Sequence, residues 1–232
     1  MNKRILSDRL LAAASLVNGA EIAADIGTDH GLLPVYLVEQ NRAKRAIAMD
    51  LRTEPLKRAA DYIREVRLSS KIDVRLSDGF EKMEPFEADI VTILGMGGPL
   101  ITKILEKGKS KLNSSMKLIL SPQSEYREYR EYLSQNGFVI EAELALFDRG
   151  KFYCIETVRY TGEPYELTEA ELEYGPCLVG AKDATLIEQL KKEEGILSGI
   201  LENLNRDGSD KSIARREEIR AKLSLVQGLL ER

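Results

Sequence analysis

The stretch Ala23-Ala24-Asp25-Ile26-Gly27-Thr28-Asp29-His30-Gly31 decides the fold of this chain. It is an apolar run that ends in a carboxylate and a glycine-containing turn, and a helix-like segment, 32–40, follows at once. A strand, a tight turn and a helix N-terminus in this order form the ligand-binding edge of an α/β sheet, where the backbone approaches a ligand closely. We therefore predict that the first strand of a nucleotide-binding domain ends here.

The charge of this turn indicates the class of ligand. Its spacing departs from the dinucleotide fingerprint G-x-G-x-x-G, because Asp25 precedes the first glycine and Asp29 stands where a second glycine would. Two carboxylates would repel a pyrophosphate and attract an ammonium or sulfonium group. The turn therefore favours S-adenosylmethionine over NAD as the cofactor.

Strand-like and helix-like segments alternate up to residue 160. The predicted strands are 21–26, 45–49, 72–76, 89–94, 117–120, 138–147 and 152–160, and the predicted helices are 2–17, 32–40, 54–66, 99–107 and 125–135. This alternation predicts a Rossmann-like, doubly wound, mostly parallel seven-stranded sheet of the α/β class. Asp148-Arg149-Gly150 indicates a hairpin between the last two strands, which adds a terminal antiparallel strand, as in Rossmann-like methyltransferases.

The pattern changes after residue 161. Residues 162–180 include Pro164, Gly175 and Pro176 and are predicted to be a linker. In 181–232, two runs of apolar residues at three- and four-residue spacing flank the turn-like segment 207–210. We expect an antiparallel helical hairpin of the coiled-coil type there, following a cofactor-binding domain at 1–161.

Composition limits the other partners. The chain has 232 residues, a net charge of −4 and no apolar run long enough for a membrane helix, so we expect no membrane partner. One histidine and two cysteines, Cys154 and Cys177, lack the spacing of metal ligands, so we expect no metal. Two cysteines are too few for a disulfide scaffold, so we expect a cytoplasmic location. We also expect a monomer. Basic residues gather near 42–45, 103–117 and 215–222, and such local patches leave a nucleic-acid partner open.

Polar or glycine-bearing turns end each of the first four predicted strands, at the edge where parallel strands present their carboxyl ends. Asp50 suits a ribose diol, Asp78 can accept from an adenine amino group, and Gly95 admits a ligand to the backbone. A single Asp in a turn is most often a backbone cap, so the prediction depends on recurrence at successive strands. The predicted cofactor-binding residues are Asp25, Gly27, Thr28, Asp29, Gly31, Asp50, Leu51, Asp78, Gly79, Gly95, Met96 and Gly97.

Four segments together carry a family resemblance. They read D-I-G-T-D-H-G-L-L-P at 25–34, S-D-G at 77–79, I-L-G-M-G-G at 93–98 and L-S-P-Q at 120–123. In these segments the chain resembles the bacterial tRNA adenine-22 N1-methyltransferase family. The resemblance implies a Rossmann-like domain with a helical appendage, S-adenosylmethionine as cofactor and adenine 22 of tRNA as substrate. Family members commonly carry Gln-Pro-Asn where this chain has Ser121-Pro122-Gln123, a difference on the expected substrate side.

The target atom decides which catalytic groups are needed. No Asn-Pro-Pro-Tyr-like sequence, the usual clamp for an exocyclic amine, follows the fourth predicted strand, which agrees with attack by a ring nitrogen. Neutral adenine N1 already has a free lone pair, so positioning and nearby negative charge matter more than a general base. We predict Asp29 as the catalytic charge, with His30 orienting it.

An adenine in folded tRNA must be unstacked before it can react, at a cost of a few kcal/mol that backbone contacts must offset. Arginines of the predicted hairpin would provide such contacts to phosphates. The predicted substrate-binding residues are Arg9, Gly98, Pro122, Gln123, Arg215, Arg216 and Arg220.

Two other functions fit the same residues. A methyltransferase of a small metabolite would use the hairpin as a dimerisation element. A non-catalytic domain would bind S-adenosylmethionine or a nucleotide and recruit a partner through the hairpin.

Overall fold

The computed structural model describes residues 5–206 and 210–231, and it divides the chain into two compact units, residues 1–167 and 168–232. Each unit has its own packing and is treated separately below. The first residues of the predicted helix 2–17 and most of the predicted turn 207–210 lie outside the described residues.

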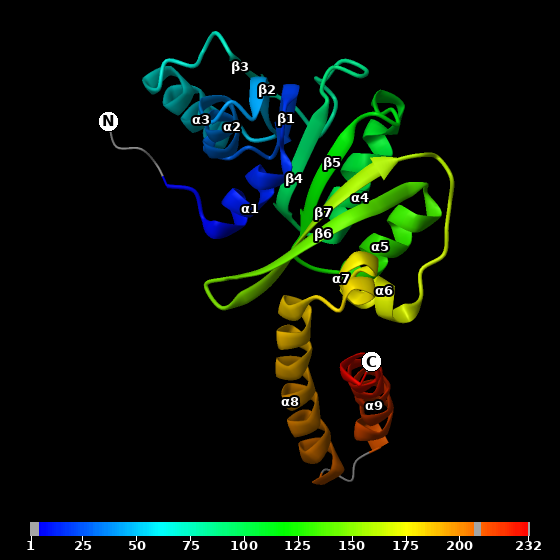
Figure 1. Ribbon diagram of the computed structural model, residues 1–232. Coiled ribbons are helices and arrows are strands. Elements are labelled where there is room, and N and C mark those ends of the chain that lie inside the picture. The colour runs from blue at the N-terminus through cyan, green and yellow to red at the C-terminus, as the bar shows by residue number, and fades with distance from the viewer. Residues whose placement is uncertain (1–4, 207–209, 232) are drawn as a thin grey trace. The chain divides into compact units, whose positions relative to one another are not determined.

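The N-terminal unit is built on one seven-stranded sheet (Figure 1). Its strands are β1 (Ala20–Ile26), β2 (Ala43–Asp50), β3 (Ile72–Leu76), β4 (Ile90–Met96), β5 (Lys117–Pro122), β6 (Phe138–Asp148) and β7 (Lys151–Tyr160). They lie in the order β3-β2-β1-β4-β5-β7-β6, with β7 antiparallel to both of its neighbours and the other described pairs parallel. The predicted Rossmann-like sheet with a late antiparallel strand is confirmed.

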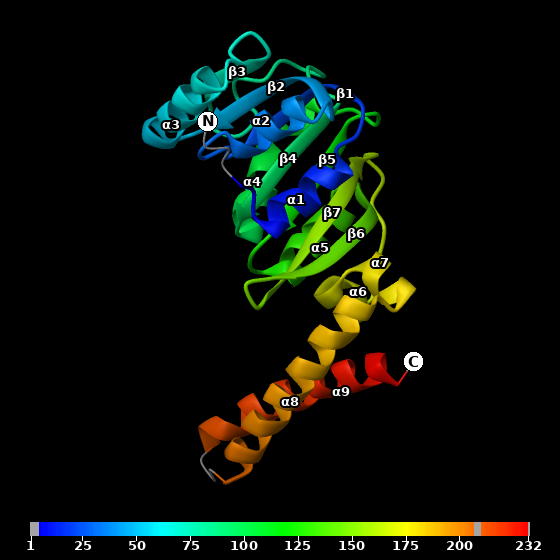
Figure 2. The same cartoon turned by 60° about the vertical axis from the view of Figure 1, so that its left-hand side comes forward.

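Helices cover both faces of this sheet (Figures 1 and 2). They are α1 (Asp8–Leu16), α2 (Leu32–Glu39), α3 (Thr53–Glu65), α4 (Gly98–Gly108) with the 3₁₀ turn η1 (Lys109–Lys111), and α5 (Tyr126–Gln135). The N-cap Ser7 begins α1, because its hydroxyl accepts a hydrogen bond from the Leu10 amide. On one face, Val17 and Leu37 pack with Ile155 in a shared core, and each such side chain contributes about 1.5–3 kcal/mol by burial.

The strand order creates the site. The chain runs outward from β1 to β3 and then returns to place β4 on the other side of β1. The carboxyl ends of β1 and β4 therefore lie next to each other at the point where the order reverses, which is where open α/β sheets bind ligands.

The C-terminal unit consists of α6 (Glu169–Tyr174), α7 (Pro176–Ala181), α8 (Ala184–Arg206) and α9 (Asp210–Leu230) among the described residues. The long helices α8 and α9 contact each other, with Lys222 Nζ 3.1 Å from Glu193 Oε1. The hairpin arrangement agrees with the predicted pairing of two helices. Its coiled-coil character stays a prediction.

The predicted linker 162–180 differs from the structure, because most of it is helical. Thr168 begins α6 with a capping box: its hydroxyl accepts from the Glu171 amide, and the Glu171 carboxylate accepts from the Thr168 amide at 2.8 Å. Gly175 and Pro176 interrupt the helix rather than abolish it, and buried Leu172 and Leu178 anchor the two short segments. The boundary between the units lies at 167/168, later than the predicted 161.

None of the helices in the described part of the chain has the length and apolarity to cross a membrane.

Candidate functional site

A cavity of about 500 Å³ opens at the carboxyl ends of β1 to β4. Most of the predicted cofactor-binding residues line it, together with Arg9 and His30. Those predicted residues are Asp25, Gly27, Thr28, Asp29, Asp50, Leu51, Asp78, Gly79, Gly95 and Met96. The topology has brought the ends of four strands into one site.

The turn after β1 is held by the backbone of β2. The amides of Gly27 and Thr28 donate to the Met49 carbonyl at 2.8 and 2.9 Å. Gly27 has φ +80°, and the Met96 methyl occupies the space that a side chain at Gly27 would need. Glycine is required here for both its left-handed backbone and its lack of a Cβ.

Asp50 organises the next part of the turn. Its buried carboxylate accepts from the Asp29 amide at 3.2 Å and from the Arg52 amide at 2.9 Å. The first bond holds Asp29 in a left-handed conformation, φ +51°, which an aspartate tolerates better than most residues. Asp50 therefore fixes the position of the neighbouring candidate catalytic residue.

Asp25 is a buried carboxylate of the site, with 6 % of its surface exposed. Burial raises its pKa from 3.8 to about 6, although the Thr92 hydroxyl, which donates to it at 2.6 Å, opposes this shift. The nearby Asp50 adds to the increase. A cationic ligand would relieve the cost of charging this group.

The predicted catalytic pair lies at the mouth of the cavity. His30 Nε2 is 3.5 Å from Asp29 Oδ2, and the two side chains are 36 % and 57 % exposed. The distance is long for a hydrogen bond but close enough for His30 to orient the carboxylate. Asp29 is accessible to a second substrate as well as to the cofactor cavity.

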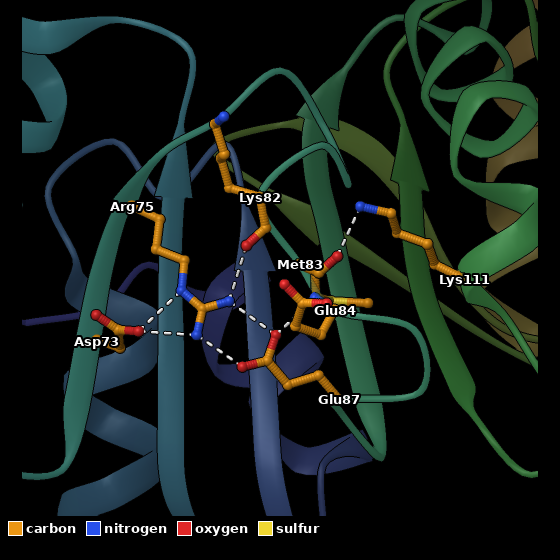
Figure 3. A network of polar contacts seen from close by, with 7 residues as sticks. All are labelled: Asp73, Arg75, Lys82, Met83, Glu84, Glu87 and Lys111. Carbon is orange, nitrogen blue, oxygen red and sulfur yellow. Dashed lines mark hydrogen bonds and ion pairs between the residues drawn. The ribbon is translucent and has the colours of Figure 1, made fainter.

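A polar network fixes the loop between β3 and β4, which carries Asp78 and Gly79 (Figure 3). Arg75 donates twice to Glu87, at 2.6 and 2.7 Å, and also binds Asp73. From the other side, Lys111 donates to the carbonyls of residues 80, 81 and 83 at 2.6–2.8 Å. The loop that carries Asp78 and Gly79 is thus held at several points by side chains of the protein.

Asp78 itself has a protein partner. Lys107 Nζ lies 2.8 Å from its Oδ2, and this hydrogen bond lowers the pKa of Asp78 below its usual value. The carboxylate is thereby kept ionised as an acceptor. Lys107 and Lys111 belong to the basic run near 103–117, and both bind groups of this loop.

Three polar atoms of the cavity wall are buried and have no hydrogen-bond partner among the described residues. They are Arg9 Nε and His30 Nδ1, together with Thr28 Oγ1, which has no partner of good geometry but lies close enough to Asp25 to lower its pKa. Buried polar groups are normally paired, so such a concentration at one cavity indicates a place for ligand atoms.

The predicted substrate residues Pro122 and Gln123 lie close to this wall. β4 is irregular between Leu94 and Met96, where Gly95 has φ +77°, and Met96 pairs with Pro122 at the end of β5. Pro122 is buried, whereas Gln123 is exposed. The backbone amide of Gln123 donates to the Met96 carbonyl at 2.9 Å. Gln123 is therefore the accessible member of the pair.

Three predicted glycines are outside the cavity lining. Gly31 begins α2 and lies against Ala59 of α3, and Gly97 and Gly98 lie against Ser124 and Glu125 at the start of α5. A side chain at Gly98 would meet the Ser124 carbonyl at 2.8 Å. These positions require glycine for helix packing, which sequence alone does not distinguish from ligand contact.

The arginines Arg215, Arg216 and Arg220 belong to α9 in the C-terminal unit. Arg215 and Arg220 are exposed, and Arg215 pairs with Glu218 at 2.6 Å.

Several lining residues were not predicted from the sequence. One of them is Leu100, which is 48 % exposed and, with the predicted Leu51 at 65 %, provides apolar surface at the cavity rim. The other lining residues missed were Leu10, Ile26, Leu32, Leu33, Arg52, Ser77, Leu94 and Ile104. The first leucine positions of helices carry no sequence signal for a ligand, because they look like core residues.

The chain is similar in sequence and fold to known proteins. A family model described as tRNA (adenine(22)-N(1))-methyltransferase matches residues 23–228. A Bacillus subtilis protein of that description is 32% identical over 100% of this chain and 99% of its own length.

Two solved structures with cofactor-type ligands are also similar. One is a putative tRNA methyltransferase from Streptococcus pneumoniae in complex with S-adenosyl-L-methionine, with 32% identity, a TM-score of 0.85 and coverage of 97% of this chain and 100% of that one. The other comes from M. capricolum in complex with S-adenosyl-homocysteine, with 26% identity, a TM-score of 0.82 and coverage of 98% and 99%.

Proposed function

This chain belongs to the tRNA (adenine(22)-N(1))-methyltransferase family, and we infer that it methylates N1 of adenine 22 in tRNA with S-adenosylmethionine. The observation that carries this inference is the full-length family match. The carboxylate-lined cavity at the switch point of the sheet supports it independently. A tRNA substrate would place the reaction in the cytoplasm.

The residues of the cavity fit the cofactor. S-adenosylmethionine supplies an electrophilic methyl group bound to a cationic sulfur. Asp50 and Asp78 offer acceptors for ribose and adenine, and the buried Asp25 offers a counter-charge for the ammonium of the methionine part. The exposed Leu51 and Leu100 provide apolar contact for the flat adenine ring.

We propose that Asp29 stabilises the positive charge that develops on the acceptor adenine. Its carboxylate is exposed at the cavity mouth, the Asp50 bond fixes its backbone, and His30 lies 3.5 Å from it. Because adenine N1 has a free lone pair, no side chain has to remove a proton before attack. Negative charge fixed at this place before reaction would contribute directly to the rate.

The function is tested by methyl transfer from labelled S-adenosylmethionine to a tRNA transcript, followed by nucleoside analysis. We expect 1-methyladenosine with adenine at position 22 and no transfer when guanine replaces it. Transfer to another position, or none alongside cofactor binding, would contradict the proposed substrate.

Asp29→Asn tests the catalytic residue while leaving backbone and volume almost unchanged, since asparagine tolerates the left-handed conformation. We expect kcat at saturating cofactor to fall about 10- to 100-fold, because negative charge near the transition state is lost. Asp61→Asn, on the exposed face of α3, is the matched control. Full turnover by Asp29→Asn would exclude the role.

We also propose that Arg215, Arg216 and Arg220 of α9 contact tRNA phosphates. If three or four phosphates are contacted, the slope of log affinity against log salt concentration is about −3 to −4. Replacing all three arginines by glutamine should bring the slope toward zero. An unchanged slope would return these side chains to ordinary surface charge.

A further inference from the structure

Tyr126 is the first residue of α5 and lies close in sequence to the end of β5. Backbone hydrogen bonds join the segment before it to the end of β4: the Gln123 amide donates to the Met96 carbonyl at 2.9 Å, and the Gly98 amide donates to the Ser124 carbonyl at 3.1 Å. Tyr126 therefore begins its helix beside the strand end at which this chain lacks an Asn-Pro-Pro-Tyr clamp.

A buried cation supports the Tyr126 ring from the protein interior. The guanidinium carbon of Arg130 lies 5.6 Å from the ring centre, a cation–π contact. Arg130 is itself buried and is held by the carboxylates of Glu143 and Glu156 at 3.6 and 2.8 Å. Tyr126 is half-buried, so the accessible part of its ring lies on the side away from Arg130.

A second tyrosine lies near this ring. Tyr153 of β7 is also half-buried. Burial raises the pKa of the Tyr126 hydroxyl, and the nearby Cys154 and Tyr153 groups add to the increase. The two half-buried tyrosines are therefore neighbours, although they come from different elements.

Arg9 connects the tyrosines to the cofactor cavity. Its guanidinium carbon lies 5.0 Å from the centre of the Tyr153 ring, and the residue also lines the cavity. A Cβ built on Gly95, in the same cavity wall, would lie 3.6 Å from a terminal nitrogen of Arg9 and 3.6 Å from Gln123 Nε2. Tyr126 and Tyr153 thus lie next to the cavity without being part of its lining.

We propose that the acceptor adenine stacks on Tyr126, with Arg130 positioning the ring from behind and Tyr153 bordering the same place. This inference rests on the proposed function. A base taken out of the tRNA loses its stacking neighbours, and an aromatic ring replaces them. The electron-rich face of a tyrosine also favours the base as it becomes cationic on methylation.

Two tRNA transcripts that differ only at position 22 test the contact by binding. One carries adenine and the other an abasic site, which offers no ring to stack. With S-adenosylhomocysteine bound to the enzyme, Tyr126→Ala should weaken binding of the adenine transcript about 10- to 100-fold and that of the abasic transcript less than about twofold. Tyr126→Phe keeps the ring and should bind both transcripts like wild type.

Two further variants separate stacking from packing. Tyr126→Leu keeps apolar bulk over Arg130 but lacks a flat ring, so it should behave like Tyr126→Ala. Phe86→Ala removes an aromatic ring that is 58 % exposed and precedes the amino end of β4, at the opposite end of that strand from Gly95. This control should bind both transcripts like wild type.

Turnover gives a second readout. The kcat/KM for the adenine transcript should fall about 10- to 100-fold in Tyr126→Ala and stay near wild type in Tyr126→Phe. The affinity for S-adenosylhomocysteine should not change in either variant, because Tyr126 lies outside the cavity lining.

Equal weakening of both transcripts by Tyr126→Ala would overturn the proposal, because a ring that supports only the fold or the tRNA backbone does not distinguish them. Unchanged binding of both transcripts would overturn it as well. A wild-type protein that forms no 1-methyladenosine from the adenine transcript would instead reject the proposed function on which the assignment rests.

Discussion

The turn after β1 and the loop after β3 lie at the same edge of one sheet, but they differ in how far the polar groups around them are paired within the protein. Around the β3–β4 loop, Arg75 of β3 and Lys111 of η1 find partners within the protein (Figure 3). Lys107 of α4 likewise binds Asp78 of this loop. At the wall that includes the β1 turn, Arg9 and His30 keep buried nitrogen atoms without hydrogen-bond partners among the described residues.

The difference separates scaffold from ligand surface. A loop whose charges are paired internally is held in one conformation and offers a preformed surface. A wall with unpaired donors and a carboxylate of raised pKa is less stable by itself and gains when a ligand supplies the missing partners. Changes to paired charges should therefore affect folding, whereas changes to the wall should affect binding.

The largest effect is expected at a fully buried example of paired charge. Glu143 and Glu156 lie opposite each other on β6 and β7, and Arg130 of α5 lies 3.6 and 2.8 Å from them. Arg130→Met leaves two buried carboxylates without their cation and should lower the free energy of unfolding by about 3–5 kcal/mol. Urea denaturation measures this loss.

Glu156→Gln in the Arg130→Met background should restore part of that stability, because it removes one of the unpaired charges. A loss below about 1 kcal/mol in the single variant would show that water or rearrangement satisfies the carboxylates and that the pairing is unimportant.

The second-largest effect on stability is expected at Asp25, in the wall of the cofactor cavity. Asp25 keeps its proton to about pH 6 in the folded state but loses it near 3.8 when unfolded, so its contribution to stability falls as pH rises through this window. Above pH 6 the ionised Asp25 carboxylate lowers the free energy of unfolding by about 3 kcal/mol. Asp25→Asn should therefore be more stable than wild type at pH 7.5, and the difference should disappear at pH 3.5.

Denaturation of the ligand-free protein at several pH values gives this difference, and the same variant should bind S-adenosylhomocysteine more weakly. A variant that is less stable than wild type at pH 7.5 would show that the ionised carboxylate supports the fold. That result would contradict the expectation that this carboxylate destabilises the ligand-free protein.

The smallest of these effects is expected in the β3–β4 loop, where the charges are partly exposed. Arg75 and Glu87 are 22 % and 21 % exposed, so Arg75→Met should lower stability by about 2 kcal/mol, less than the fully buried case. The pKa of Glu87, lowered by its bonds with Arg75, should return toward its usual value.

Part of the Arg75 contribution is lost in wild type as the pH falls below the usual pKa of Glu87, so the two proteins should converge in acid. Lys107→Met, which breaks an exposed pair in the same loop, is the control and should leave the denaturation midpoint unchanged. A Lys107 effect as large as that of Arg75 would contradict the ranking by burial.

Much of the fold could be predicted from local sequence. The strands ending at Asp25, Asp50 and Asp78 are apolar runs with polar turns, and strand periodicity is a local property. The helices α6 and α7 were not predicted, because Gly175 and Pro176 resemble linker residues, although Thr168 and Glu171 have the T-x-x-E spacing of a capping box, which is readable in the sequence.

The sequence by itself determined the order of strands and helices, the sign of charge at the strand ends and the family resemblance, since each is encoded by residues close together in the chain. Only the tertiary structure decided that Arg9, Gly95, Gln123 and Tyr153 meet around one point. Likewise, only folding pairs Lys111 with a loop about 30 residues earlier, and buries Arg130 between two glutamates. These contacts join distant segments, and their energies depend on burial, which the packing of the whole unit sets.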